Sequence, residues 1–154
     1  MKRFLILVIV FISLVSISGC KNKFSYDDMN KVNYETLLDL KGSYIVVAYQ
    51  ANCANCDKLK GTVYDYIKYI DDNPDAMPIY AINVNTGVNK KMLLLRNEDY
   101  PKNMVGATSY KNIKVKATPS IMVIKNKTLV KVISDYNTLT PVTDGKAYFK
   151  ELMK

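Results

Sequence analysis

Two cysteines separated by two residues are the part of the chain best suited to chemistry. Cys53 and Cys56 follow a short apolar run, 44–49, and an amphipathic helical pattern begins directly after them. Thiolate rather than thiol attacks a disulfide, and the free N–H groups and dipole at the start of a helix stabilise negative charge on Cys53. The spacing therefore favours thiol-disulfide redox chemistry.

A static structural disulfide is the alternative interpretation of the same pair. In the chain-entropy model, the stability gained from a disulfide grows with the length of the loop that it closes. A bridge across two intervening residues constrains little of the unfolded chain. The spacing thus argues for exchange over a purely structural role.

The composition argues against several other kinds of site. The 154-residue chain contains no histidine, so the commonest general base and transition-metal ligand is absent. A structural zinc site needs about four Cys or His ligands, and haem attachment needs histidine where Asp57 stands. The net charge of +8 comes from scattered lysines with few arginines, which does not suit nucleic-acid binding. Disulfide exchange itself requires no metal or organic cofactor.

The first 19 residues have the pattern of a secretory signal peptide. A basic start, 1–3, precedes an apolar run over 4–15 and a region of small residues. Residues 17–20 resemble the lipobox of bacterial lipoproteins, which implies that Cys20 carries a diacylglycerol and becomes the first mature residue. Lipidation of Cys20 would leave one cysteine pair in the mature chain.

Two alternatives remain for this N-terminal segment. A permanent membrane-spanning helix is one, although the apolar run is shorter than the roughly 18 residues that a span requires. An ordinary signal peptide with a leftover Cys20 is the other. We expect a signal peptide over 1–19, a lipid-anchored tether over 20–28 and a single domain over 29–154.

Hydrophobic periodicity predicts an α/β domain. The apolar residues within 29–40 have helical spacing, so a first helix is predicted over this range. The runs 44–49 and 79–84 are predicted to be buried parallel strands, joined by a helix that starts at the cysteines and ends near 73–74.

The C-terminal half is predicted to contain an antiparallel hairpin and a last helix. Strands over 120–124 and 129–133 are joined by a tight turn in which Asn126 accepts positive φ. Asp144 is a plausible N-cap for the last helix. An extra helix is expected within 90–99.

This order of elements resembles the thioredoxin-like family. The resemblance rests on Cys53–Cys56 opening a helix and on the motif Ala117–Ser120 entering the hairpin. It implies a central mixed sheet flanked by helices, and a cis peptide bond before Pro119 that faces the cysteines. It also implies that Thr118 and Pro119 form a substrate-docking corner, that Cys53 is the attacking thiol and that Cys56 is the resolving thiol.

Several residues depart from the pattern of this family. Asn52 replaces the usual tryptophan before the first cysteine, and the buried carboxylate and lysine of cytosolic thioredoxins fall on Val47 and Ala81. The connection over 85–116, before the proline strand, is longer than in the family. This insertion either packs on the same core or forms a surface for a partner or substrate.

These observations predict an exported, lipid-anchored thiol-disulfide oxidoreductase on the extracytoplasmic face of a bacterial membrane. It would be a monomer that exchanges disulfides with exported proteins or peptides, and a membrane redox partner would reset it. The alternative is a non-catalytic binding lipoprotein of the same fold, or an accessory factor for a secreted peptide system of the bacteriocin type.

Overall fold

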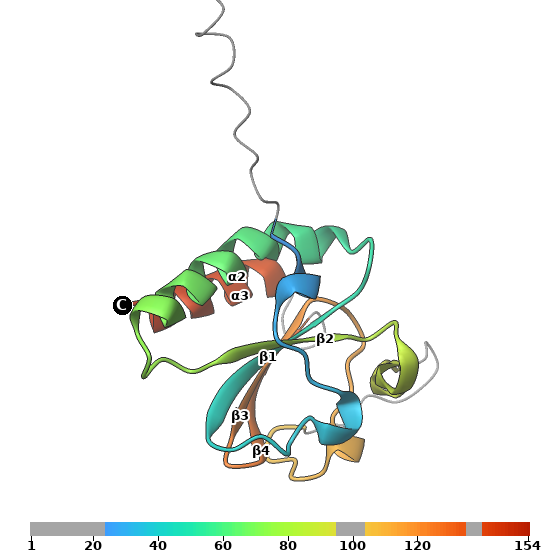
Figure 1. The fold of residues 1–154 in the computed structure, drawn as a ribbon. Coiled ribbons are helices and arrows are strands. Elements are labelled where there is room, and N and C mark those ends of the chain that lie inside the picture. The colour runs from blue at the N-terminus through green and yellow to red at the C-terminus, as the bar shows by residue number, and fades with distance from the viewer. Residues whose placement is uncertain (1–23, 95–103, 135–139) are drawn as a thin grey trace, which may run out of the picture.

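The computed structural model describes residues 24–94, 104–134 and 140–154. A four-stranded sheet forms its centre, and two α-helices lie together on one side of that sheet (Figure 1). The strands are β1 (Ser43–Tyr49), β2 (Ile79–Asn83), β3 (Ser120–Lys125) and β4 (Thr128–Ile133). The helices are α2 (Ala54–Asp72) and α3 (Pro141–Leu152), and four short 3-10 turns are η1 (Tyr26–Asp28), η2 (Tyr34–Thr36), η3 (Gly87–Met92) and η4 (Tyr110–Asn112).

The sheet is mixed, as the sequence predicts. Its strand order is β2-β1-β3-β4, with β1 parallel to β2 and antiparallel to β3. Residues 44–49 of β1 are all buried, because this strand has a neighbour on each edge and a packed layer on each face. The predicted strands and the helix after the cysteines are all present.

Both α-helices pack on one face of the sheet. Leu59 and Val63 of α2 and Phe149 of α3 are fully buried in a cluster with Ile45 and Val47 of β1. The apolar positions of α2 recur at helical spacing, so one side of this helix is directed at the sheet.

The opposite face is covered by 3-10 turns and loops rather than by α-helices. Its apolar cluster includes side chains from the segment before β1 and from the insertion; among them are Tyr34, Leu37, Met92, Met104, Ile113 and Val115. The described residues of the insertion therefore pack on the core of the domain. The expectation of helices flanking the sheet is confirmed, and within the described ranges both α-helices lie on the same face.

The predicted helix over 29–40 is wrong. Residues 29–33 are extended, and the backbone N–H of Val32 donates to the carbonyl of Ala81 in β2 at 3.1 Å. Met29 packs on the side of α2, whereas Val32 and Tyr34 pack on the opposite side. The apolar side of one helix faces a single core. Residues whose side chains enter the cores on both faces of the sheet therefore pass around the sheet edge in an extended conformation.

Smaller differences occur at three other elements. The extra helix expected within 90–99 lies partly outside the described residues, and its described part belongs to η3 and an extended stretch. The hairpin turn has positive φ at Asn126 and at Lys127. Helix α3 has Thr140 as its N-cap, four residues before the predicted N-cap Asp144, and starts at Pro141, because proline suits the first position of a helix.

The N-terminal residues 24–28 pack against the domain, although we placed them in the tether. Tyr26 is buried, and its ring stacks on that of Tyr49 with centroids 5.0 Å apart. Ser25 and Asp28 form a reciprocal capping box around η1. No helix among the described residues has the length and hydropathy to cross a membrane.

Candidate active site

The cysteine pair lies at the junction of β1 and α2. Cys53 and Cys56 form a disulfide with Cα atoms 5.1 Å apart. Cys53 is the N-cap residue of α2 and is partly exposed, whereas Cys56 is one turn into the helix with only 2 % of its surface exposed. The two sulfurs therefore differ in their access to an incoming molecule.

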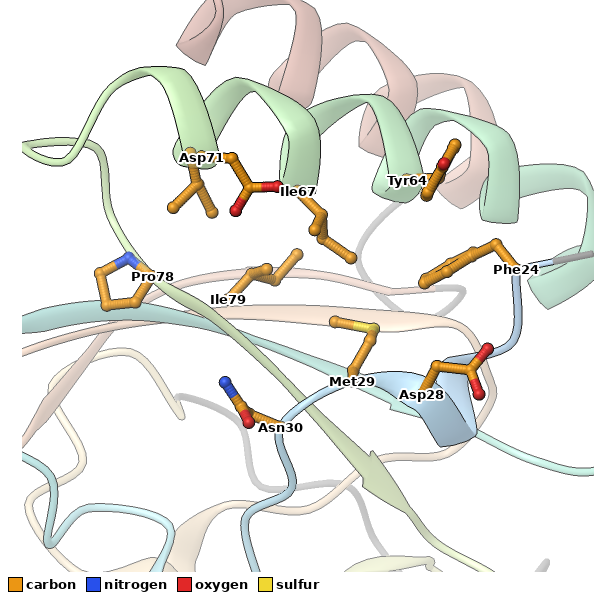
Figure 2. Close-up of a pocket in the computed structure, with 10 residues that line it drawn as sticks. Phe24, Asp28, Met29, Asn30, Tyr64, Ile67, Asp71, Pro78 and Ile79 are labelled. Atoms are coloured by element: carbon orange, nitrogen blue, oxygen red, sulfur yellow. The ribbon is translucent and has the colours of Figure 1, made fainter. Parts of the chain in front are cut away.

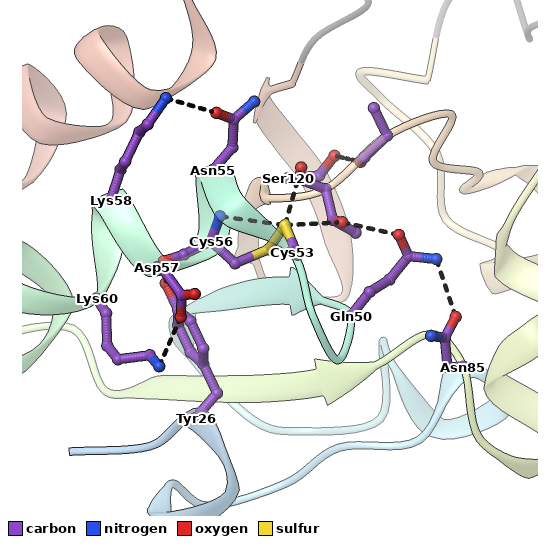
Figure 3. Close-up of a disulfide and its surroundings, with 12 residues drawn as sticks. Tyr26, Gln50, Cys53, Asn55, Cys56, Asp57, Lys58, Lys60, Asn85 and Ser120 are labelled. Atoms are coloured by element: carbon purple, nitrogen blue, oxygen red, sulfur yellow. Dashed lines mark hydrogen bonds and ion pairs between the residues drawn. A yellow bond between two sulfur atoms is a disulfide. The ribbon is translucent and has the colours of Figure 1, made fainter. Parts of the chain in front are cut away.

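The start of α2 supplies a hydrogen bond to the more exposed sulfur. The backbone N–H of Cys56 donates to Sγ of Cys53 at 3.1 Å (Figure 3). Such an N–H, together with the helix dipole, stabilises a thiolate that forms on Cys53. This is the arrangement expected from the spacing of the cysteines.

Thr118 and Pro119 lie against the same sulfur. The Thr118–Pro119 peptide bond is cis, as the family resemblance implies. The carbonyl oxygen and Oγ1 of Thr118 are each 3.4 Å from Sγ of Cys53. Four predicted site residues thus meet at one place, while the fifth, Cys20, lies outside the described residues.

Two amide side chains at this corner were missed by sequence reasoning. The hydroxyl of Thr118 donates to Oε1 of Gln50 at 3.0 Å, and Nε2 of Gln50 donates to Oδ1 of Asn85 at 2.9 Å (Figure 3). Gln50 directly follows β1 and Asn85 lies two residues beyond β2. Their positions at neighbouring strand ends were the signal that could have found them.

The backbone conformation of Asn52 accounts for one departure from the family pattern. Its φ is 58°, in the left-handed region, where asparagine is better tolerated than most residues. Asn52 turns the chain from the end of β1 toward the N-cap cysteine. The sequence showed that tryptophan was absent here but not why asparagine suits the position.

A cavity of about 310 Å³ lies beside the disulfide. It is lined by both cysteines and by residues of the N-terminal segment, β1 and α2, among them Tyr26, Asp27, Tyr49, Asp57 and Lys60. The hydroxyl of Tyr26 donates to the carbonyl of Cys56 at 2.9 Å. Burial, and to a lesser degree the charge of Asp57, raise the pKa of Tyr26, so this hydroxyl stays protonated at neutral pH.

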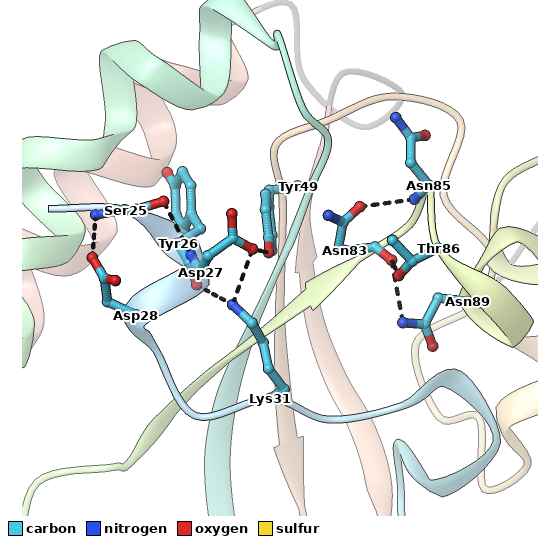
Figure 4. Close-up of polar contacts among 10 residues, drawn as sticks. All are labelled: Ser25, Tyr26, Asp27, Asp28, Lys31, Tyr49, Asn83, Asn85, Thr86 and Asn89. Atoms are coloured by element: carbon cyan, nitrogen blue, oxygen red, sulfur yellow. Dashed lines mark hydrogen bonds and ion pairs between the residues drawn. The ribbon is translucent and has the colours of Figure 1, made fainter.

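Asp27, a charged residue of the N-terminal segment, lines the same cavity. The hydroxyl of Tyr49 donates to Asp27, whose carboxylate is 3.7 Å from Nζ of Lys31 (Figure 4). Burial lowers the pKa of Lys31, and the carboxylate of Asp27 opposes that change. The segment predicted as a tether and helix therefore builds one wall of the candidate site.

The interior beside Cys56 is apolar. Val47 and Ala81 are register partners on β1 and β2, are fully buried, and belong to the same cluster as Cys56. Both side chains lack an ionisable group. A buried proton acceptor at these two positions is therefore excluded.

A second cavity, of about 350 Å³, lies between α2 and the N-terminal segment (Figure 2). Apolar side chains line it from both sides: Ile67 comes from α2, and Met29 and Ile79 lie across from it. Asp28 and Asp71 also line it. Neither cysteine lines it, so the redox site belongs to the smaller cavity. Within the described ranges, no group of three or more His, Cys, Asp or Glu side chains is arranged to hold a metal ion.

Comparison with known proteins identifies the fold. No family model and no curated protein matches the chain. A solved chain from a study of the thiol-resolving mechanism of yeast mitochondrial 1-Cys peroxiredoxin with the glutathione and thioredoxin systems superposes with a TM-score of 0.50 at 16% identity, covering 83% of this chain and 99% of that chain. The fold is thioredoxin-like.

Two solved thioredoxins are also similar to the chain. Thioredoxin f2 of Chlamydomonas reinhardtii has a TM-score of 0.44 and 16% identity, with 76% of this chain and 97% of that chain covered. Thioredoxin f from spinach chloroplast, in its long form, has a TM-score of 0.44 and 14% identity, with 77% and 85% covered. On its thioredoxin-like fold, this chain carries a Cys-X-X-Cys pair, Cys53 and Cys56.

Proposed function

We propose that the protein is an extracytoplasmic thiol-disulfide oxidoreductase that exchanges disulfides with exported proteins or peptides. The observation that carries the proposal is the unequal placement of the two sulfurs. Cys53 is partly exposed at the N-terminus of α2, while Cys56 is buried behind it. An exposed thiol that attacks and a protected thiol that resolves are the two parts that exchange requires.

In the reducing direction, the thiolate of reduced Cys53 attacks one sulfur of a substrate disulfide. A bond forms between Sγ of Cys53 and that sulfur, and the other substrate sulfur leaves as a thiolate. The N–H of Cys56, 3.1 Å from Sγ of Cys53, stabilises the attacking thiolate. The backbone of Thr118 lies close enough to pair with an extended substrate during this step.

The second step releases the substrate. The thiolate of Cys56 attacks Sγ of Cys53, the bond between Cys53 and the substrate breaks, and the substrate sulfur leaves with the electron pair. The substrate gains two electrons, and the protein returns to the disulfide form seen in the structure. Run in reverse, the same steps oxidise a substrate dithiol.

The location and partners belong to the same proposal. The signal-peptide pattern and the lipobox-like residues before Cys20 support export and lipid attachment. Cytosolic reductants do not reach that side of the membrane, so a membrane redox partner would reset the cysteine pair.

Turnover of a disulfide substrate tests the proposal. The purified protein should reduce insulin disulfides or oxidise a dithiol peptide in at least one of a series of glutathione buffers of different redox poise. Cys53→Ser should abolish turnover in every buffer. In cells, Cys56→Ser should accumulate mixed disulfides through Cys53, because the resolving thiol is missing, and the double variant should show none.

A non-catalytic binding protein of the same fold is the second candidate. The fully buried, apolar pair Val47 and Ala81 beside Cys56 favours it, because no ionisable group is present there to accept a proton from the resolving thiol. Absence of turnover at every redox poise, together with no adducts from Cys56→Ser, would support binding and contradict the oxidoreductase.

A further inference from the structure

The hydroxyl of Thr118 has one proton and two neighbouring acceptors. Oε1 of Gln50 lies 3.0 Å from Oγ1, and Sγ of Cys53 lies 3.4 Å from it. Thr118 is 7% exposed, which limits the access of water to this hydroxyl. Gln50 and the cysteine sulfur therefore compete for a single hydrogen bond.

The outcome of this competition depends on the redox state of Cys53. A disulfide sulfur is a weak acceptor, so in the oxidised protein the shorter bond to Gln50 is preferred. A thiolate on Cys53 carries a full charge, and hydrogen bonds to charged groups are roughly twice as strong as neutral ones. Reduction therefore shifts the preference of the Thr118 proton toward sulfur.

We propose that Gln50 and Asn85 form a redox-responsive amide relay that releases the Thr118 hydroxyl to Cys53 on reduction. The inference rests on the proposed redox function of the pair. In the oxidised arrangement, Thr118 donates to Gln50 and Gln50 donates to Asn85 at 2.9 Å. Rotation of the Gln50 amide by half a turn places Nε2 at Oγ1 of Thr118 and Oε1 toward Asn85.

The rotated arrangement keeps every hydrogen bond of the chain. Thr118 donates to the thiolate, Nε2 of Gln50 donates to Oγ1 of Thr118, and Nδ2 of Asn85 donates to Oε1 of Gln50 once the Asn85 amide also turns. The side chain of Asn85 is free to turn because the residue is exposed. Its backbone is held in place, since its N–H donates to Oδ1 of Asn83 at 3.0 Å.

Gln50 is thus a positioning residue that acts on Cys53 through Thr118. An amide can exchange donor for acceptor by rotating, whereas a carboxylate can only accept. Glutamate at position 50 would keep the Thr118 proton in both redox states. It would also place a negative charge near the developing thiolate.

Side-chain amide resonances of Gln50 and Asn85 provide the first test. In the full chain labelled with ¹⁵N, both resonances should move between the oxidised and reduced states, while that of Asn126, in the turn between β3 and β4, should not. Thr118→Val should abolish the movement at Asn85. An Asn85 resonance that is unchanged by reduction of the wild type would overturn the relay.

Titration of the Cys53 thiolate by its ultraviolet absorbance provides the second test, in a Cys56→Ser background. Gln50→Glu should raise the midpoint by about one pH unit, because the hydrogen bond to sulfur is lost. Ala51→Glu is the matched control: it adds the same charge at the adjacent exposed position without reaching Thr118 and should raise the midpoint by less than half as much. Equal shifts of the midpoint in the two variants would overturn the relay, because the added charge alone would then explain both.

Neither measurement needs a substrate. A relay that responds to reduction in a protein without turnover would contradict only the proposed function. Turnover without a response at Gln50 and Asn85 would contradict only the relay.

Discussion

At the scale of single residues, the two sides of the cysteine pair differ in polarity. Cys53 meets hydrogen-bonding groups from Thr118 and from the start of α2, while Cys56 is buried with Val47 and Ala81. The polar groups that share a cavity with Cys56 come from the N-terminal segment, from Tyr49, Gln50 and Asn52 before the cysteines, and from Asp57 and Lys60. Among the described residues, a proton acceptor for Cys56 would therefore lie in this cavity and not at positions 47 and 81.

Introducing a carboxylate on the apolar side tests this description. Val47→Asp should lower the free energy of unfolding by about 2–4 kcal/mol at pH 7, because an ionised carboxylate there has no partner. Burial raises the pKa of such a carboxyl, so the loss should shrink as the pH falls toward 4. Urea unfolding at several pH values measures both effects.

The matched control is Val130→Asp. Val130 is 37% exposed on β4, and its replacement should cost less than about 1 kcal/mol with little pH dependence. Equal losses at the two positions would contradict the apolar environment assigned to Val47.

Buried tyrosines should make the protein sensitive to alkaline pH. Burial raises the pKa of Tyr34, Tyr44 and Tyr66 to about 12, whereas an unfolded tyrosine titrates near 10. Above pH 10 the unfolded chain loses these protons first. Stability should be complete below pH 10 and fall by about 1.4 kcal/mol per pH unit per tyrosine as the pH rises toward 12.

Tyr44→Phe isolates one of these contributions. It removes the hydroxyl that donates to the carbonyl of Leu37 at 2.7 Å and should reduce the alkaline slope by about 1.4 kcal/mol per pH unit. Denaturant unfolding between pH 9 and 12 measures this slope in the variant and in the wild type. An unaltered slope in Tyr44→Phe would contradict the contribution assigned to Tyr44.

At the scale of elements, a glycine sets the distance between α3 and its neighbours. A Cβ atom at Gly145 of α3 would lie 2.6 Å from Cδ1 of Ile121 and 3.3 Å from Cδ1 of Leu59. A side chain at this position would therefore force Cδ1 of Ile121, and to a smaller extent Cδ1 of Leu59, to move.

Alanine at two helical glycines separates packing from helix propensity. Gly145→Ala should destabilise the protein by about 1 kcal/mol, because overpacking costs more than the better helix former contributes. Gly61→Ala in α2, where an added Cβ meets nothing within 4 Å, should stabilise it by about 0.5–1 kcal/mol. Thermal unfolding of both variants measures these changes in stability. A Gly145→Ala variant that is more stable than the wild type would contradict the close contact of Gly145 with Ile121.

The elements also show what the sequence could and could not predict. Strands and helices with a single periodic pattern, such as β1 and α2, were predicted correctly. The 29–40 segment was not, because its apolar residues are shared between two cores and only the folded sheet defines which side each one faces. The positions of the two cysteines and of Pro119 followed from local motifs, whereas Gln50 and Asn85 meet only because β1 and β2 are adjacent and parallel.

At the scale of the whole molecule, the N-terminal segment links the candidate site to the predicted lipid anchor. Ser25, Tyr26 and Asp27 line the cavity beside the disulfide, and Cys20 lies five residues before Ser25. An anchored protein would therefore hold its active site close to the membrane surface. The active site would then encounter exported substrates where they leave the membrane.

Cys20→Ala tests this arrangement. The variant should move from the membrane fraction to the soluble extracytoplasmic fraction, because lipidation needs the cysteine thiol, and its purified form should keep wild-type turnover. Lys21→Ala, which retains the thiol, should stay in the membrane fraction. Membrane retention of the Cys20→Ala variant would argue for an uncleaved spanning segment.

The loops that border the sheet have a consequence for self-association. Asn30 and Val32 bond to Ala81 on the outer edge of β2, and Gly106 and Ala107 bond to Leu129 on the outer edge of β4. An open sheet edge is a template on which a second copy of a chain can add strands and begin to aggregate. The proposed lipid anchor would confine the protein to two dimensions and raise its local concentration, so the loops bonded to Ala81 and Leu129 would hinder strand addition where aggregation would be fastest.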